Sequence, residues 1–314
     1  MKKWMKACMV TGLSCMIVGA VLYGAGYVFG GKTYVRTADL NHFGTSGASE
    51  QTASSILPKT QVDDYRNLDI HLDMLDLNVV RSEDDHFYIS YEAQSKNGKP
   101  AVTYSVENDT LTVNERETKG HYVNIDVDFL ADLLNRKEER QQKNLITLYV
   151  PERTKINHVK IDGDMSDIRL SSMTVTSGSL QTYSGDVVID DCDIRHFGLK
   201  TDMGEVEVER SNLDTCSFSS GSGDFDFTDI IWKGNTEITS DMGEVDIEGT
   251  PEVLTKLAIQ VTTDMGGIDV SDQLNGKVME NETDNLQTFE QKVEKATGSL
   301  TIETNSGDIS VDCD

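Results

Sequence analysis

A short motif recurs through the second half of the chain, and no other feature constrains the fold as strongly. The stretches TDMGEVEVERSNL, TSDMGEVDIEGTP and TTDMGGIDVSDQL begin at Thr201, Thr239 and Thr262. When the chain is aligned on the glycine of this motif, successive units lie 19, 19, 19, 20, 23 and 41 residues apart. The aligned positions are Ser166, Gly185, Gly204, Gly223, Gly243, Gly266 and Gly307. A repeat of this length is typical of solenoid folds.

Each unit carries the same apolar pattern around its aligned position. In all seven units an apolar residue stands five residues before that position and again two and four residues after it, and six units have Thr or Ser three residues before it. A period of two predicts two short strands joined at a corner. One unit cannot bury its apolar face alone, but units stacked about 4.8 Å apart bury a continuous column. We therefore predict an all-β fold, a single-strand-stacked β-solenoid, with an antiparallel sandwich as the alternative. Glycine favours a tight corner, and the predicted corners are Gly185, Gly204, Gly223, Gly243, Gly266 and Gly307.

The first residues predict a membrane anchor. Residues 1–6 form a basic tail, and residues 7–31 carry no charge. A helix of that length spans roughly 37 Å, which is enough to cross the hydrocarbon core of a bilayer. The three lysines of the tail predict a cytoplasmic N-terminus with the bulk of the chain outside the cell, so we expect a single-pass cell-membrane protein. A signal peptide cleaved after Val18–Ala20 is the alternative.

The rest of the chain divides into a stalk and one domain. Residues 32–60 are rich in Ser, Thr, Ala and Gly, which predicts a flexible stalk. Residues 61–314 form the predicted domain, with strands at 67–73, 75–80, 86–93, 101–108, 110–117 and 145–151 and with repeats from about 156. Two insertions interrupt it, a helical pattern at 128–144 and a polar segment at 271–296. The last strand, GDISVDCD, is expected to form an open edge of the solenoid over which residues 271–296 can fold.

The domain also resembles a known family. The N-terminal anchor, the stretch LDLNVVRSEDDHFYISYEA, LYVP before the repeats, and the SGD and MGE corners carry the resemblance. The chain is similar, over roughly residues 65–314, to the bacterial putative-adhesin family, a domain of unknown function that includes LiaG-like envelope proteins of Gram-positive bacteria. This resemblance implies a surface-exposed repetitive β domain and supplies no catalytic residues. The two insertions depart from the family pattern.

Acidic residues flank the predicted corners in a regular array. Six follow the aligned position directly and four stand two residues before it: Asp167, Asp186, Glu205, Asp224, Glu244 and Asp308, and Asp164, Asp202, Asp241 and Asp264. In a stacked coil, equivalent carboxylates would lie about 5 Å apart, where their repulsion in water is under about 1 kcal/mol per pair. Calcium, which binds oxygens at about 2.4 Å, could bridge two of them. The array therefore predicts either a solvated acidic edge or a ladder of weak cation sites.

Charge and motifs exclude several function classes. Residues 1–36 hold five basic and no acidic residues, so the remaining chain holds 23 basic against 54 acidic residues, a net charge of −31. Such a field repels nucleic acid. The stretch GYVFGGKT at 26–33 fits a phosphate-binding loop, but it follows the apolar run instead of a buried strand, so we predict no nucleotide binding. The chain has no HExxH, GxSxG or CxxC motif, and we expect no enzyme activity and no cofactor. The cysteines are expected to be free thiols, with Cys216 in the core.

These observations lead to two function hypotheses. The first is a cell-surface binding or scaffold protein that attaches to wall polymer or to another cell. The second is an accessory or sensor component of an envelope-stress response that acts through a membrane-protein partner. Attachment predicts that a ligand is retained on a face of the solenoid, whereas the accessory role predicts dependence on the anchor and the stalk.

Overall fold

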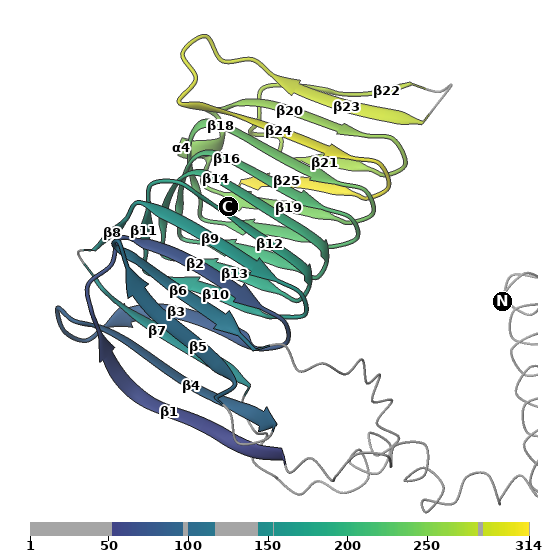
Figure 1. The fold of residues 1–314 in the computed structure, drawn as a ribbon. Helices are drawn as coiled ribbons and strands as arrows, with labels where there is room; N and C mark the ends of the chain where they lie inside the picture. The colour runs from purple at the N-terminus through teal and green to yellow at the C-terminus, as the bar shows by residue number, and fades with distance from the viewer. Residues whose placement is uncertain (1–51, 97–99, 117–143, 153, 282–284, 314) are drawn as a thin grey trace, which may run out of the picture. The chain divides into compact units, whose positions relative to one another are not determined.

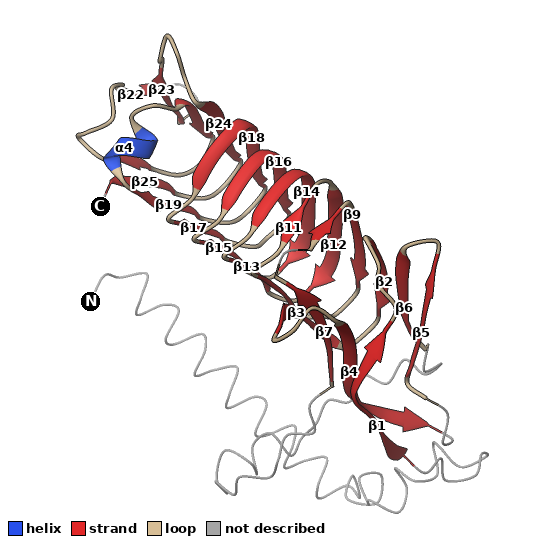
Figure 2. Cartoon of the chain, turned by 90° about the vertical axis from the view of Figure 1, so that its left-hand side faces the viewer, coloured by secondary structure: helices blue, strands red, loops and turns tan. Residues whose placement is uncertain are grey.

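The computed structural model describes residues 52–96, 100–116, 144–152, 154–281 and 285–313. Residues 52–314 form one compact unit. Strands make up almost all of its described part, with one four-residue helix, α4 (Pro251–Leu254). The strands stack as successive coils, one beside the next, as Figures 1 and 2 show. The expected all-β solenoid is therefore confirmed.

Two sheets form the main sides of the coil. Sheet 1 contains, in spatial order, β22 (Val278–Asn281), β23 (Leu286–Gln291), β20 (Ala258–Thr263), β24 (Gly298–Thr304), β18 (Ile231–Ser240), β16 (Asn212–Ser220), β14 (Asp193–Met203), β12 (Gly178–Ser184), β9 (His158–Gly163), β2 (Asn67–Leu72), β6 (Thr110–Glu115) and β5 (Val102–Glu107). Sheet 2 contains β1 (Thr52–Val62), β4 (Phe87–Lys96), β7 (Leu145–Pro151), β3 (Asp76–Ser82), β10 (Ile168–Ser171), β13 (Val187–Asp190), β15 (Val206–Glu209), β17 (Phe225–Thr228), β19 (Val245–Gly249), β25 (Ile309–Cys313) and β21 (Ile268–Val270).

The pairing within the coils is parallel and follows the sequence repeat. Leu180 of β12 pairs with Leu199 of β14, and Val187 of β13 pairs with Val206 of β15. Equivalent residues of successive units therefore stack directly on one another. An antiparallel sandwich is excluded, because antiparallel pairs within the described residues occur only among the outer strands at the two ends of the stack.

The central coils have a third, short side that the sequence did not predict. The strands β8 (Lys155–Ile156) and β11 (Thr174–Val175) pair in register with each other, and β11 pairs with the first residues of β14. The chain enters and leaves this side through left-handed backbone, the region of positive φ that glycine and asparagine usually supply. Most of the residues that adopt it here are not glycine: Ser172, Asp191, Arg210 and Asp229 follow sheet 2, and His196, Thr215 and Gly234 form a bend within β14, β16 and β18.

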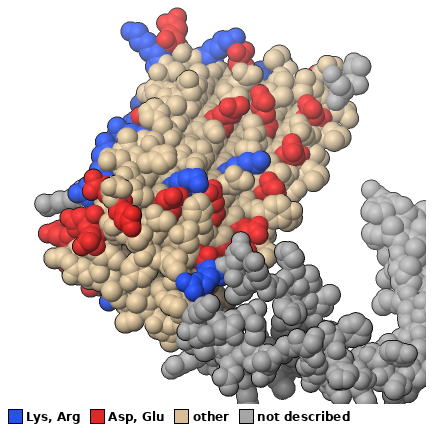
Figure 3. Space-filling view, viewed as in Figure 1, with Lys and Arg blue, Asp and Glu red and all other residues tan. Residues whose placement is uncertain are grey.

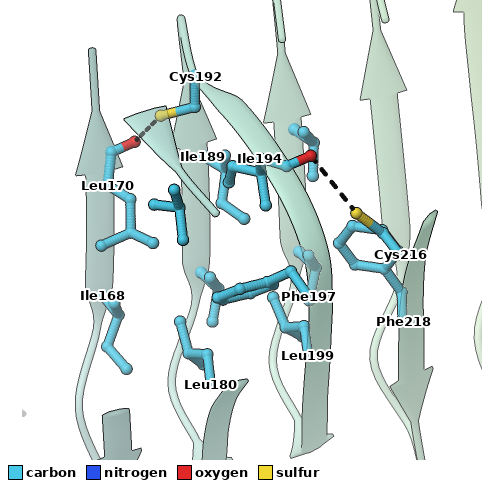
Figure 4. Packing of buried hydrophobic residues seen from close by; sticks show 14 of the residues in the cluster. Ile168, Leu170, Leu180, Ile189, Cys192, Ile194, Phe197, Leu199, Cys216 and Phe218 are labelled. Atoms are coloured by element: carbon cyan, nitrogen blue, oxygen red, sulfur yellow. Dashed lines mark hydrogen bonds between the residues drawn. The ribbon is translucent and has the colours of Figure 1, made fainter. Parts of the chain in front are cut away.

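The apolar columns predicted from the sequence form the core between the sheets (Figure 4). All of their members are buried except Ile268 and Val270, which lie on the terminal strand β21 and are half-buried. Aromatic rings fill one part of the core, where the centroid of Phe227 lies 5.0 Å from that of Phe218 and 5.3 Å from that of Trp232. Cys216 is buried as predicted, and Cys192, Cys216 and Cys313 are free thiols. Apolar burial of this kind is the main favourable term in folding.

The first complete coil and the C-terminal coil both lie inside the stack, although β1 forms the outer edge of sheet 2. The C-terminal coil, β24 and β25, lies between the coil of β18 and β19 and the coil of β20 and β21. At the other end, the coil of β2 and β3 lies between β6 and β7 on one side and β9 and β10 on the other. The expectation that the last strand forms an open edge is therefore wrong, because β25 pairs on both sides. Residues 271–296 do fold over the end of sheet 1, where β22 and β23 form a hairpin that adds to β20.

Several predicted segments lie wholly or partly outside the described residues. These are the basic tail at 1–6, the anchor at 7–31, most of the stalk and all but the last residue of the helical insertion at 128–144. No helix in the part of the chain that the structure describes is long and apolar enough to cross a membrane. The stalk prediction for residues 32–60 is wrong at its end, because Thr52 begins β1. Its Ser and Thr residues, compatible with coil or strand, form a strand where β4 offers pairing partners.

Candidate functional site

The repeated motif forms one edge of the solenoid, which we call the Asp-Met corner. It comprises the four residues that join sheet 1 to sheet 2 in each coil, which in stacking order are 73–76, 164–167, 183–186, 202–205, 221–224, 241–244, 305–308 and 264–267. Backbone hydrogen bonds join neighbouring corners, for example Met165 N–H to the Asp73 carbonyl at 2.9 Å and Met242 N–H to the Gly221 carbonyl at 3.1 Å. The corner is therefore a continuous ladder along the coil.

The first coil belongs to the corner although the sequence alignment missed it. Its residues Asp73, Met74, Leu75 and Asp76 stack on Asp164–Asp167, as shown by the pairing of Leu72 with Gly163 and of Leu77 with Ile168. The dipeptide Asp-Met was the available signal. It occurs five times in the chain and every time at this corner, at residues 73, 164, 202, 241 and 264.

The corner glycines are required because successive backbones nearly touch. A Cβ atom at Gly204, where φ is +122°, would lie 2.3 Å from the Gly185 carbonyl oxygen. At Gly223 it would lie 1.9 Å from the Gly204 oxygen. Real Cβ contacts are far longer, so a side chain at either position would force the coils apart. All six predicted corner glycines occupy the corner, and close approach of backbone explains them better than positive φ, which only Gly185 and Gly204 adopt among the six.

A buried column of hydroxyl groups supports the corner from inside. The Thr and Ser residues three positions before the aligned position are all buried. Thr201 Oγ1 donates to the Met203 carbonyl at 3.0 Å, and Thr304 Oγ1 donates to the Gly307 carbonyl at 2.9 Å. Ser220 Oγ accepts a 2.6 Å hydrogen bond from Gly223 N–H. These three side chains satisfy backbone groups that a tight turn leaves without partners. Thr182 Oγ1 in the same column has no hydrogen-bond partner among the described residues.

The acidic residues after the glycines form a hydrogen-bonded ladder. In each case an aspartate Oδ1 accepts the backbone N–H of the equivalent residue in a neighbouring coil. The pairs are Asp76 with Asp167 N–H (3.1 Å), Asp167 with Asp186 N–H (2.9 Å), Asp186 with Glu205 N–H (3.0 Å), Asp224 with Glu244 N–H (2.9 Å) and Asp308 with Gly267 N–H (2.7 Å). These aspartates therefore fasten one coil to the next.

The structure brings all ten predicted acidic residues to this corner. Asp202 is half-buried, and the other nine are exposed: Asp164, Asp167, Asp186, Glu205, Asp224, Asp241, Glu244, Asp264 and Asp308. No group of three or more His, Cys, Asp or Glu side chains within the described residues is arranged to hold a metal ion. The cation ladder, including calcium, stays a prediction.

A row of exposed methionines runs along the same corner, and the sequence analysis did not identify it. The exposed fractions of its members are 53% for Met74, 52% for Met165, 45% for Met203, 63% for Met242 and 66% for Met265. In the three intervening coils a serine takes the methionine's place: Ser184, Ser222 and Ser306. From the second coil onward, Met and Ser therefore alternate strictly along the row.

The outer face of sheet 2 extends the acidic surface beyond the corner. Burial, together with the charges of neighbouring aspartates, raises the pKa of Asp246. A hydrogen bond between the carboxyl groups of Glu207 and Glu209 raises the pKa of Glu207 and lowers that of Glu209. These residues belong to two columns that the pairing of β15, β17, β19 and β25 brings together: Glu207, Asp226 and Asp246, and Glu209, Glu248 and Asp312.

The outer face of sheet 1 is mixed in charge. Basic and acidic side chains are interleaved on it, as Figure 3 shows. Lys160 Nζ lies 2.8 Å from the Asp162 carboxylate, and His71 lies 3.2 Å from the same residue. An open hollow of about 660 Å³ also lies on this side, lined by residues of β14, β16, β18 and β24 that include His196 and Glu237. The Asp-Met corner thus differs from this face in having acidic and apolar side chains without basic ones.

Comparison with known proteins finds a matching family and several similar crystal structures. Residues 65–312 match the family described as Toastrack DUF4097. Three crystal structures illustrate the similarity. A "putative cell adhesion protein" from Clostridium sporogenes is 13% identical, with 83% of this chain and 99% of that chain covered and a TM-score of 0.36. A "putative adhesin" from Bacteroides fragilis is 13% identical (84% and 98% covered, TM-score 0.46), and a "putative lipid binding protein" from Parabacteroides distasonis is 14% identical (85% and 98% covered, TM-score 0.44). No curated protein matches the chain.

Proposed function

We propose that this chain, which belongs to the Toastrack DUF4097 family, is a non-enzymatic binding scaffold that presents the Asp-Met corner outside the cell. In this proposal the predicted span at 7–31 anchors the chain in the cell membrane, with its N-terminus in the cytoplasm. The rest of the chain lies outside, and the solenoid binds through its outer surface.

The observation that carries the proposal is the exposure of five methionines in one row along one edge of the solenoid. Burying a methionine side chain is worth about 1.5–3 kcal/mol, so leaving five exposed does not serve stability. Exposed apolar side chains that gather along one edge, unlike those scattered singly, mark a candidate interaction surface. Backbone hydrogen bonds, close-packed glycines and the aspartate ladder hold this row in place. Such an edge suits binding of an extended ligand at many equivalent points.

Attachment to wall polymer or to another cell is the first form of this function. Wall polymers are largely anionic, and a net charge of −31 over residues 37–314 would repel them. Attachment to such a polymer therefore needs either a specific site or a bridging cation at the acidic corner.

Co-sedimentation with isolated Gram-positive cell walls tests this form. Purified residues 37–314 are mixed with walls in the presence of calcium and again with a chelator. Binding that requires calcium would support both attachment and cation binding at the corner. Binding without calcium would support attachment through another part of the surface, and failure to sediment in both conditions would refute wall attachment.

The composition of the corner favours a second candidate, an accessory or sensor component that acts on a membrane-protein partner. The 32 residues of the Asp-Met corner include twelve acidic residues and no Lys or Arg. A basic protein surface complements this charge, whereas an anionic polymer does not. A photo-crosslinking amino acid at Met242, introduced in cells, should then capture a membrane protein. Capture should be lost when residues 7–31 are replaced by a cleaved signal peptide.

A further inference from the structure

We propose that the Asp-Met corner docks an extended, basic peptide segment of a partner protein that carries an apolar residue at every third position. This inference rests on the proposed binding role and names the ligand of the same edge. Three observations carry it: the spacing of the methionines, the serine positions between them, and the charge on both sides of the row.

The methionines are not required by the fold. Ser184 pairs with Met165 on one side and with Met203 on the other, so the same backbone pairing accepts either residue. Ser222 and Ser306 occupy the same position in two further coils. Because serine forms this corner as well as methionine does, the exposed methionines need an explanation other than stability. Methionine is flexible and polarisable, and it is common on surfaces that bind peptides.

The alternation of Met and Ser sets a period. Neighbouring coils are about 4.8 Å apart, so successive methionines from Met165 to Met265 lie roughly 10 Å apart with a short serine between them. A polyproline-type extended segment rises about 3.1 Å per residue with three residues per turn, so every third side chain faces the same way about 9.3 Å further on. One apolar side chain can therefore fill each serine gap in turn. The row from Met165 to Met265 spans six coil steps, about 29 Å, which matches roughly nine residues of such a segment.

Charge on both sides of the row selects the remaining side chains of the segment. Each methionine directly follows an aspartate: Asp73, Asp164, Asp202, Asp241 and Asp264. On the other side stands the ladder of aspartates and glutamates that begins at Asp76 and ends at Asp308. Lys or Arg at the positions between the apolar residues would lie beside these carboxylates. The attraction is exposed to water, so it speeds association and weakens as salt screens it.

The test measures binding of a defined peptide to the full chain, reconstituted through its predicted span in nanodiscs of neutral phosphatidylcholine. The probe is a fluorescent nine-residue peptide in which Leu-Arg-Pro is repeated three times, and the readout is fluorescence anisotropy. We expect saturable binding that weakens at least tenfold when salt is raised from 50 to 500 mM. A peptide of the same composition with its three leucines adjacent should bind at least fivefold more weakly.

Protein variants separate the methionine row from general charge attraction. The double variant Met203→Ser, Met242→Ser places in two coils the residue that neighbouring coils already use, so the fold is retained. We expect it to bind the probe at least tenfold more weakly. Met279→Ser is the matched control, because Met279 is 57% exposed but lies on β22, outside the corner and two strands from β20. This control should bind like the unmodified chain.

Several outcomes would overturn the proposal. Equal binding by the double variant and the unmodified chain would show that the methionines do not contact the peptide. Equal binding of the two peptides would reduce the interaction to charge alone, and tighter binding of a helix-forming peptide of the same composition would refute the extended geometry. If the double variant loses peptide binding but still sediments with cell walls, wall attachment does not use the methionine row. Failure of the docking proposal is therefore distinguishable from failure of the attachment function.

Discussion

Replacing Gly223 by alanine tests whether close contact between coils fixes the corner. The added Cβ would lie 1.9 Å from the Gly204 carbonyl oxygen and 2.8 Å from Ser220 Oγ. An ordinary contact needs about 3.4 Å, so the two coils must separate locally by about 1.5 Å. That displacement would break the hydrogen bond from Ser222 N–H to the Asp202 carbonyl, now 2.9 Å, and disturb the one between Gly223 N–H and Ser220.

The expected cost follows from these losses. Two hydrogen bonds contribute about 1 kcal/mol each, and the strain of overpacking adds about 1–2 kcal/mol. We therefore expect Gly223→Ala to lower the free energy of unfolding by about 3–4 kcal/mol. For a domain of this size the melting temperature should fall by roughly 5–15 °C.

Gly198→Ala is the matched control for this prediction. Gly198 lies on β14, and a Cβ there would have Ser217 Oγ at 3.9 Å as its nearest neighbour. Alanine at such a site should be neutral or slightly stabilising, because it restricts the unfolded chain. Urea unfolding of residues 52–314, followed by circular dichroism, measures both variants. If Gly223→Ala unfolds at the same urea concentration as Gly198→Ala, the corner can yield, and backbone contact does not explain its glycines.

Three further predictions follow from the corner, the acidic face and the order of the coils. Asp186→Ala removes the acceptor of Glu205 N–H and should lower the free energy of unfolding by about 1 kcal/mol, whereas Asp186→Asn keeps an acceptor and should lose less than half of that; equal losses in urea unfolding would assign the effect to charge instead. The pKa of Asp246 is raised above 3.8 in the fold, so the folded state holds the proton of this carboxyl group more tightly than the unfolded chain does. The stability that the protonated carboxyl group contributes is present below pH 3.8 and is lost as the pH rises through the folded pKa. Asp246→Asn should therefore raise the free energy of unfolding at pH 7, by no more than about 0.5 kcal/mol because the site is exposed, and raise the melting temperature slightly. The gain in melting temperature should disappear at pH 3, and a gain that persists there would contradict this cause. Ending the chain at residue 296 removes β24 and β25 from the interior of the stack and should abolish cooperative unfolding measured by calorimetry, whereas a mere loss of one outer coil would leave a cooperative transition at lower temperature.

The sequence predicted the repeated parts of this fold because each unit repeats its own local pattern. Strand, corner and inward-facing side chains recur at nearly fixed spacing, so the core columns and corner glycines were identified correctly. The sequence alignment missed the first coil because the residue that stacks on Asp76 is Asp167, 91 positions away, with no repeat between them. The left-handed bends at His196 and Arg210 escaped because neither residue type indicates such backbone, which stacking imposes on them.

The sequence predicted where the candidate site lies, but it did not predict what the carboxylates bind or that the methionines are exposed. The spacing placed ten acidic residues on one edge, and the structure places them there. Whether a carboxylate binds a cation or a backbone N–H depends on differences of about 1 Å, which a repeat pattern does not contain. The methionines were visible in the same motif, but their exposure became evident only when the direction of each corner residue was known.

The order of the coils decides where this protein can change length. Chain order and stacking order agree only from β9 to β19, since at both ends a terminal coil is enclosed by its neighbours. A duplicated unit of 19 residues can therefore be inserted between residues 158 and 249. The insertion increases the distance between the two ends of the stack by about 4.8 Å and leaves the structure of both ends unchanged. A unit added after β25 has no free place beside that strand, because β19 and β21 already pair with it. The solenoid can therefore gain or lose length one coil at a time in its central part. The Asp-Met corner then lengthens or shortens in equal steps, while the coils at both ends keep their structure.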